Sequence, residues 1–235
     1  MVYSISVVIP VHNEEASLNK TINELIPVLK KNFSDYEAII VESGSTDKSG
    51  VIADQIAKKN MRIRVIHQGK KLGYGNALRR GLRECKNDLS VYTDCDRPYD
   101  FKYLAEAAKY MKNYDAVTGY RVGKRESFSR YIMSIGGNLF AKIFFGVGVK
   151  DEGFPFKMIK TDLIKKFNLV SNYSFITVEI LSELKRYKAK IKEIPVRYKI
   201  RTEGKSKFMD FGNVVIKHLI DSINFLKKGK WHHIK

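Results

Sequence analysis

Short apolar runs of strand length alternate along most of the chain with longer segments in which apolar and polar residues repeat at helical spacing. An apolar run at 5–10, for example, is followed by a polar turn and then by a helix-like stretch at 16–31. We expect strands near residues 4–10, 36–41, 63–67, 89–93 and 115–118. Such alternation is typical of a mainly parallel sheet covered by helices on both faces. The pattern therefore predicts a three-layer α/β/α fold that binds its ligands at the carboxyl ends of the strands.

Two later segments, 128–145 and 208–226, have the spacing of amphipathic helices. In the first, Arg130, Asn138 and Lys142 interrupt the apolar residues, whereas a membrane span needs about 20 mostly apolar residues. The second runs into several lysines and a tryptophan, which is typical of a helix that lies in the membrane interface. Amphipathic helices also cover the cores of proteins in solution, so both interpretations stay open for the first segment. The sequence predicts peripheral membrane contact at most.

Polar side chains follow three of the predicted strands, where His12, Glu42 and Asp94 stand. Because the carboxyl ends of parallel strands meet at one edge of a sheet, we expect these residues to share a site. Asp94 and Asp96 are spaced so that both can reach one hard divalent cation, and Mg²⁺ and Mn²⁺ favour such oxygen ligands. Successive strand side chains alternate in direction, so we expect Cys95 to point into the core. By itself the Asp-x-Asp pattern is weak, since most copies are solvated turn acids.

The composition favours one globular domain with an anionic partner. The 235 residues are 44% hydrophobic, enough for a full core, and the formal net charge is +18. Such a field attracts nucleic acid, anionic membranes or phosphorylated substrates. The basic residues are spread through predicted helices without a nucleic-acid motif, so we expect no nucleic-acid partner. With two cysteines and no recognisable signal peptide, the sequence predicts a cytoplasmic protein, peripheral at the inner face of the cell membrane.

Four motifs in order resemble the family-2 inverting glycosyltransferases. They are Val-Ile-Pro-Val-His-Asn-Glu at 8–14, Glu-Ser-Gly-Ser-Thr-Asp at 42–47, the glycine-bearing helix entry at 73–81, and Asp-Cys-Asp at 94–96. The entry at 73–81 lacks the G-x-G-x-x-G spacing of dinucleotide-binding proteins. The resemblance implies the nucleotide-diphospho-sugar transferase (GT-A) fold. It predicts a catalytic domain at 1–207, followed by an amphipathic helix and basic tail at 208–235.

The resemblance also implies a nucleotide-diphosphate sugar donor and a divalent metal. Donor contacts are expected from Pro10, His12, Glu14, Glu42, Ser45, Gly73, Asn76 and Asp94. Mg²⁺ or Mn²⁺ held by Asp94 and Asp96 would neutralise the departing diphosphate as a Lewis acid. Asp96 is expected to bind the metal directly, and Asp94 either reaches it through water or contacts the ribose. The second motif departs from the family, which opens it with two aspartates where this chain has Glu42 and Ser43. The nucleotide base and the sugar therefore cannot be read from the sequence.

The acceptor is predicted from dispersed cations that are similar to the phosphate-binding positions of dolichol-phosphate mannose synthases and related polyprenyl-phosphate glycosyltransferases. These positions are Arg121, Arg130, Ser134, Arg201 and Lys207. A phosphate acceptor is already anionic and needs no general base. A hydroxyl acceptor is the alternative, and the segment 151–157, which resembles the family's Asp-x-x-Cys/Ser-Gly-Phe-Lys, then offers Asp151 as base. A non-catalytic sugar-nucleotide-binding protein is a second alternative, against which the two intact aspartates argue. The Gln-x-x-Arg-Trp signature of processive polysaccharide synthases is absent from the sequence.

Overall fold

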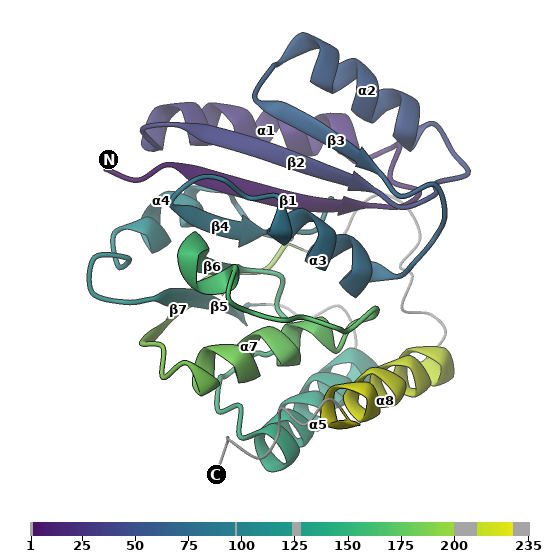
Figure 1. Cartoon of the computed structure of the whole chain (residues 1–235), viewed down its shortest axis with the longest axis vertical. Coiled ribbons are helices and arrows are strands. Elements are labelled where there is room, and N and C mark those ends of the chain that lie inside the picture. The colour runs from purple at the N-terminus through teal and green to yellow at the C-terminus, as the bar shows by residue number, and fades with distance from the viewer. Residues whose placement is uncertain (1, 97, 124–127, 200–210, 228–235) are drawn as a thin grey trace.

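One twisted sheet forms the centre of the molecule, with helices on both of its faces (Figure 1). The computed structural model describes residues 2–96, 98–123, 128–199 and 211–227. The strands are β1 Ile5–Val11, β2 Tyr36–Glu42, β3 Ile63–His67, β4 Leu89–Tyr92, β5 Ala116–Val122, β6 Lys157–Lys160 and β7 Ile191–Arg197. The helices are α1 Leu18–Asn32, α2 Ser49–Lys59, α3 Tyr74–Arg83, α4 Lys102–Ala108, α5 Phe128–Phe145, α6 Thr161–Ile164, α7 Ile176–Arg186 and α8 Phe211–Lys227.

The seven strands lie in the order β3-β2-β1-β4-β6-β5-β7. Strand β6 runs antiparallel to both of its neighbours, while the other recorded pairings are parallel. This confirms the predicted mainly parallel sheet and its five expected strands. The sequence did not reveal β6 or β7. Strand β6 has four residues with a lysine at each end, and the edge strand β7 contains Pro195, which is tolerated at a sheet edge but weakens a strand pattern.

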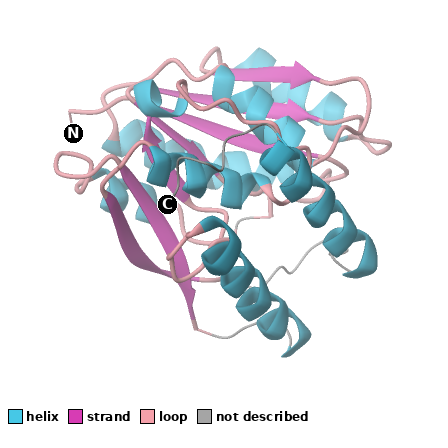
Figure 2. Cartoon of the chain, turned by 60° about the horizontal axis from the view of Figure 1, so that its bottom comes forward, coloured by secondary structure: helices cyan, strands magenta, loops and turns pink. Residues whose placement is uncertain are grey.

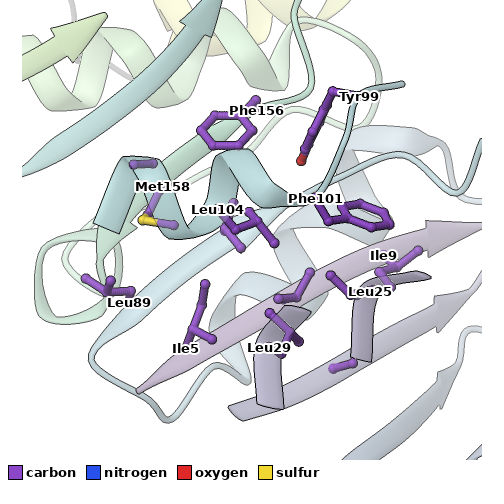
Figure 3. Packing of buried hydrophobic residues seen from close by; sticks show 14 of the residues in the cluster. Ile5, Ile9, Leu25, Leu29, Leu89, Tyr99, Phe101, Leu104, Phe156 and Met158 are labelled. Carbon is purple, nitrogen blue, oxygen red and sulfur yellow. The ribbon is translucent and has the colours of Figure 1, made fainter. Parts of the chain in front are cut away.

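Two hydrophobic clusters fill the two faces of the sheet, so the predicted three layers are present. One cluster packs α1, α2 and α4 against the sheet, with Leu25 and Leu29 of α1 facing Ile5 and Ile9 of β1 (Figure 3). The other joins α3, α5, α7 and α8 to the opposite face. Cys95 is 3% exposed and belongs to the first cluster, which confirms its expected inward direction.

Helices α5 and α8 lie side by side at one end of the molecule (Figures 1 and 2). Aromatic contacts join them, with ring centroids 5.7 Å apart between Phe140 and His218 and 5.8 Å apart between Phe145 and Phe225. Both helices fall where the sequence predicted amphipathic segments. Among the described residues, no helix is sufficiently long and apolar to cross a bilayer.

Candidate active site

The loops that follow β1 and β2 are bonded to each other at the carboxyl edge of the sheet. The side chain of Asn13 accepts the backbone N–H of Thr46 at 2.8 Å and donates to the Thr46 hydroxyl at 3.1 Å. The backbone N–H of Asn13 donates to the hydroxyl of Ser45 at 3.1 Å. Asn13 has a φ of 54°, a left-handed conformation that asparagine tolerates better than most residues. Side-chain hydrogen bonds therefore join the two loops, which carry several of the predicted donor-binding residues.

His12 and Glu14 strengthen this connection. The Nδ1 atom of His12 lies 2.9 Å from the carbonyl oxygen of Ser43, so the imidazole is oriented by the second loop. The backbone N–H of Glu14 donates to the hydroxyl of Ser49 at 2.8 Å, at the first turn of α2. Pro10, one residue before the end of β1, pairs with Val41 of β2. The predicted residues of the first and second motifs thus lie together.

Glu42 ends β2 with a buried carboxylate that is bonded on both oxygens. Oε1 accepts the backbone N–H of Ser45 at 2.5 Å, and Oε2 lies 3.3 Å from Nδ1 of His67. Burial alone would raise the pKa of Glu42, but the bonds from Ser45 and His67 outweigh it and lower the pKa. The other nitrogen of His67 lies 2.9 Å from Asp54, and this bond is the largest cause of the raised pKa of His67, with Glu42 adding to it. Glu42 is therefore a carboxylate that shapes the turn after β2.

Asp94 and Asp96 follow β4 and are both partly exposed, on either side of the buried Cys95. The hydroxyl of Tyr74, the first residue of α3, donates to Oδ1 of Asp94 at 2.9 Å. Burial and the charge of Asp94 raise the pKa of Tyr74 well above its ordinary value, so its hydroxyl stays protonated and acts as the donor. The hydroxyl of Thr21 on α1 donates to the Cys95 carbonyl, and this bond holds the turn at 94–96 against α1. Tyr74 thus orients Asp94, and Thr21 holds the turn between Asp94 and Asp96.

These two carboxylates fit a hard divalent cation that is shared with a phosphorylated substrate. Across residues 2–96, 98–123, 128–199 and 211–227, no three or more His, Cys, Asp or Glu side chains gather as a metal cluster. Mg²⁺ is commonly held by one or two carboxylates together with substrate phosphates, so a pair is sufficient. The Cys95 thiol, the softer ligand nearby, is turned into the core. The carboxylate oxygens of Asp94 and Asp96 are therefore metal ligands of the kind that suits Mg²⁺ or Mn²⁺.

The start of α3 is pressed against the segment 171–174, which precedes α7. Gly73 has a φ of 98°, and a Cβ atom there would lie 2.2 Å from the carbonyl oxygen of Asn172. At Gly75 a Cβ atom would lie 2.4 Å from the carbonyl oxygen of Tyr173. The side chain of Asn76 donates to Oδ1 of Asn172 at 3.1 Å. The glycines of the third motif therefore permit a close backbone approach at the start of α3, on either side of Tyr74.

Arg121 and Asp151, for which separate roles were predicted, form an ion pair. Nε of Arg121 donates to Oδ2 of Asp151 at 2.7 Å, and Nη2 donates to Oδ1 at 3.3 Å. The guanidinium carbon also lies 5.6 Å from the ring centroid of Phe154 and 5.4 Å from that of Tyr198. Asp151 is 6% exposed. The predicted acceptor-binding cation and the predicted base therefore neutralise each other in the structure.

The other predicted acceptor residues are less completely placed. Ser134 lies half-buried on α5. The side chain of Arg130, on the same helix, lies outside the described part of the structure, as do Arg201 and Lys207. Helix α5 is nevertheless tied to the loop that holds Asp151, because the Asn138 side chain accepts the N–H of Glu152 at 2.9 Å and donates to the Lys150 carbonyl at 3.0 Å.

A buried lysine lies beside this loop and was not singled out from the sequence. Nζ of Lys157 donates to the carbonyl oxygens of Glu152 at 2.7 Å and Phe154 at 2.9 Å. Burial lowers the pKa of Lys157 to about 8, while Glu152 acts to raise it. Burial raises the pKa of Glu152, whose carboxylate accepts the Thr177 hydroxyl at 2.9 Å. The only sequence signal for Lys157 was its place at the end of the 151–157 motif.

Several solved structures have a similar overall shape. One is glucosyl-3-phosphoglycerate synthase from Mycobacterium tuberculosis with Mn²⁺, UDP and glucosyl-3-phosphoglycerate. Its TM-score is 0.72 at 20% identity, over 94% of this chain and 79% of that one. The same enzyme with Mn²⁺, UDP-glucose and phosphoglyceric acid gives a TM-score of 0.73 at 18% identity, over the same shares. At these identities the likeness shows the fold alone, which is the expected GT-A fold.

Two curated relatives are closer in sequence. Glycosyltransferase AglD from Haloferax volcanii is 28% identical over 212 residues, which cover 86% of this chain and 34% of that protein. Undecaprenyl-phosphate 4-deoxy-4-formamido-L-arabinose transferase from Edwardsiella ictaluri is 28% identical over 209 residues, or 87% of this chain and 62% of that protein. The chain thus spans about one third to three fifths of the length of these relatives. The family model "Glycosyl transferase family 2" matches residues 6–185, and the protein belongs to that family.

Proposed function

We propose that the protein transfers a sugar from a nucleotide-diphosphate sugar to a polyprenyl phosphate at a membrane surface, with Mg²⁺ or Mn²⁺. The observation that supports this proposal is that Asp94 and Asp96 both follow β4 at the carboxyl edge of the sheet and are both partly exposed. When bound there, the metal would act as a Lewis acid on the donor diphosphate. Tyr74 would hold Asp94 in the orientation that this requires.

The joined loops after β1 and β2 would bind the nucleotide. In this proposal His12, Glu14 and Ser45 line the donor side, and Glu42 fixes the turn that presents them. An oxygen of the acceptor phosphate would attack the anomeric carbon from the face opposite the diphosphate. The bond between that carbon and the diphosphate oxygen breaks as the new bond forms, which inverts the anomeric configuration.

The acceptor phosphate would be held by cations on the other side of the site. Arg121 is the described candidate, with Arg130, Arg201 and Lys207 added from the sequence. A phosphate monoester is already anionic near neutral pH, so the reaction needs no base. The relative from Edwardsiella ictaluri carries undecaprenyl phosphate in its name, which supports an acceptor of this class.

Transfer to a hydroxyl group is the second candidate, because Asp151 stands where a base is expected. In the structure both oxygens of Asp151 are engaged by Arg121, and Nε approaches to 2.7 Å. To accept a proton from a hydroxyl, Asp151 would have to give up part of that ion pair. The pairing therefore argues against Asp151 as a free base, while a phosphate acceptor would in turn have to share the Arg121 guanidinium with Asp151.

The outward faces of α5 and α8 would bring the site to the membrane. These neighbouring helices expose large apolar side chains, each between 38% and 63% exposed: Tyr131, Ile135, Leu139, Ile143, Phe144, Val215, Ile216, Leu219, Ile220, Ile223 and Leu226. An apolar face of this size on a protein with a net charge of +18 suits an anionic bilayer interface. The protein would then act as a peripheral enzyme at the inner face of the cell membrane.

A panel of donors against two acceptors tests the proposal. GDP-mannose, UDP-glucose and UDP-N-acetylglucosamine would each be incubated with polyprenyl phosphate or with the matching polyprenol, with and without Mn²⁺. We expect a product from the phosphate, with one of the donors, that requires Mn²⁺. Transfer to the polyprenol alone would support the hydroxyl alternative. Hydrolysis or transfer at the same rate with and without Mn²⁺ would contradict the metal assignment.

A further inference from the structure

Helix α8 buries one carboxylate on its inner face. Asp221 is 1% exposed, and its two oxygens each lie 3.1 Å from the backbone nitrogen of Asn172, which donates to them. The backbone N–H of Tyr173 donates to Oδ2 at 2.7 Å. Burial raises the pKa of Asp221, and the bonds from Asn172 and Tyr173 oppose that rise. Because a buried carboxylate is costly without such bonds, α8 and the segment 171–174 hold each other in place.

The same segment supports the first turn of α3 from the other side. The carbonyl oxygen of Asn172 accepts the backbone N–H of Asn76 at 3.2 Å, and its side-chain oxygen accepts the Asn76 amide at 3.1 Å. Gly73 and Gly75 let this backbone approach so closely that a Cβ atom at either position would collide with it. A shift of the segment 171–174 must therefore shift the start of α3.

Tyr74 is the first residue of that helix and bonds to Asp94. We propose that Asp221 is a positioning residue for the metal and donor diphosphate. Through the segment 171–174 it sets the first turn of α3, and thereby the hydroxyl of Tyr74 on Asp94. The inference rests on the proposed function, because it gives Asp221 a part in binding the donor. It also means that the seating of α8, a proposed membrane helix, controls the metal side of the site.

Hydrogen exchange on the whole protein tests the physical connection without a ligand. Asp221→Asn keeps the side-chain size and removes the charge that accepts the N–H groups of Asn172 and Tyr173. We expect hydrogen exchange to become about ten- to a hundredfold faster in the peptide that contains these amides, because each loses a charge-assisted bond. Exchange at Asn76 should accelerate too. Ser222→Ala is the matched control, since the Ser222 hydroxyl is buried on α8 and donates to the carbonyl of Leu219 within the same helix.

A double-mutant cycle tests whether the connection reaches the site. Calorimetric titrations with Mn²⁺–UDP and Mn²⁺–GDP would use whichever nucleotide the wild type binds. We expect Asp221→Asn to weaken binding at least fivefold and Ser222→Ala to leave it unchanged. In the Tyr74→Phe background, Asp221→Asn should have little further effect, because it acts through the hydroxyl already removed. A general loss of stability would lower binding in both backgrounds, so the cycle separates the two explanations.

The two arms fail in distinguishable ways. If the wild type binds neither nucleotide, the proposed function loses its support while the exchange experiment still reports on the connection. Faster exchange confined to Asn172 and Tyr173, with Asn76 unchanged, would overturn the inference. Fully additive effects of Asp221→Asn and Tyr74→Phe on binding would overturn it as well.

Discussion

Removing the hydroxyl of Tyr74 should weaken the metal site without disturbing the fold. The hydroxyl lies 2.9 Å from Oδ1 of Asp94, and the raised pKa of Tyr74 keeps the proton on the tyrosine. Tyr74→Phe retains the ring and deletes that one donor. Groups that orient a metal-binding side chain typically contribute about 10–100-fold to metal affinity or activity. That range corresponds to about 1.4–2.8 kcal/mol, since each tenfold change is about 1.4 kcal/mol.

The assay measures nucleotide binding by calorimetry at a series of Mn²⁺ concentrations. We expect the Mn²⁺ concentration at half-saturation to rise about 10–100-fold in Tyr74→Phe, with metal-free nucleotide affinity nearly unchanged. Tyr187→Phe is the matched control, because the Tyr187 hydroxyl donates at 3.1 Å to the Lys166 carbonyl, outside the candidate site. Equal Mn²⁺ dependence in Tyr74→Phe and the wild type would refute the role of Asp94 as a metal ligand oriented by Tyr74.

Three further predictions concern stability and membrane contact. Because the pKa of Glu42 is lowered, its carboxylate stabilises the fold fully above pH 4.5, and this stability is lost as the pH falls through the lowered pKa. Because the pKa of His67 is raised, its imidazolium stabilises the fold fully below pH 6.5, and this stability is lost as the pH rises through the raised pKa. In thermal melts, the melting temperature of His67→Gln should fall furthest below that of the wild type between about pH 4.5 and 6.5. A difference in melting temperature that does not depend on pH would contradict this. Arg121→Ala should lower the free energy of unfolding in urea by roughly 1–3 kcal/mol, because it leaves the buried Asp151 carboxylate without its guanidinium partner. Adding Asp151→Asn should recover part of this loss, whereas two additive losses would contradict the pairing. Ile216→Glu should reduce co-sedimentation with anionic vesicles, which should also fall with salt, and unchanged co-sedimentation would remove α8 from the membrane face.

The local features of the site could be predicted from the sequence because they depend on strand periodicity. A buried strand followed by Asp94, Cys95 and Asp96 predicts alternating directions, and the structure confirms the buried thiol between two partly exposed acids. Likewise His12 and Glu42 had to meet, since neighbouring parallel strands end at the same edge.

The contacts that orient these residues join distant parts of the chain and leave no local pattern. Tyr74 reaches Asp94 across 20 positions, and Asp221 reaches Asn172 across 49. Arg121 and Asp151 each matched a family position, but their pairing depends on the packing of β5 against the loop before β6. Strands β6 and β7 escaped prediction for a related reason, since pairing within the sheet stabilises them more than their own composition does.

Transfer of a labelled sugar to polyprenyl phosphate in anionic vesicles tests the central claim most directly. The wild type and Asp96→Asn, which has nearly the same size but one charge less, would be compared across a range of Mn²⁺ concentrations. Mass spectrometry would identify the polyprenyl-phosphate sugar. We predict that the wild type forms this product only with a divalent metal and that Asp96→Asn forms almost none at any concentration. Equal product from the two proteins in chelator-treated buffer would contradict the account.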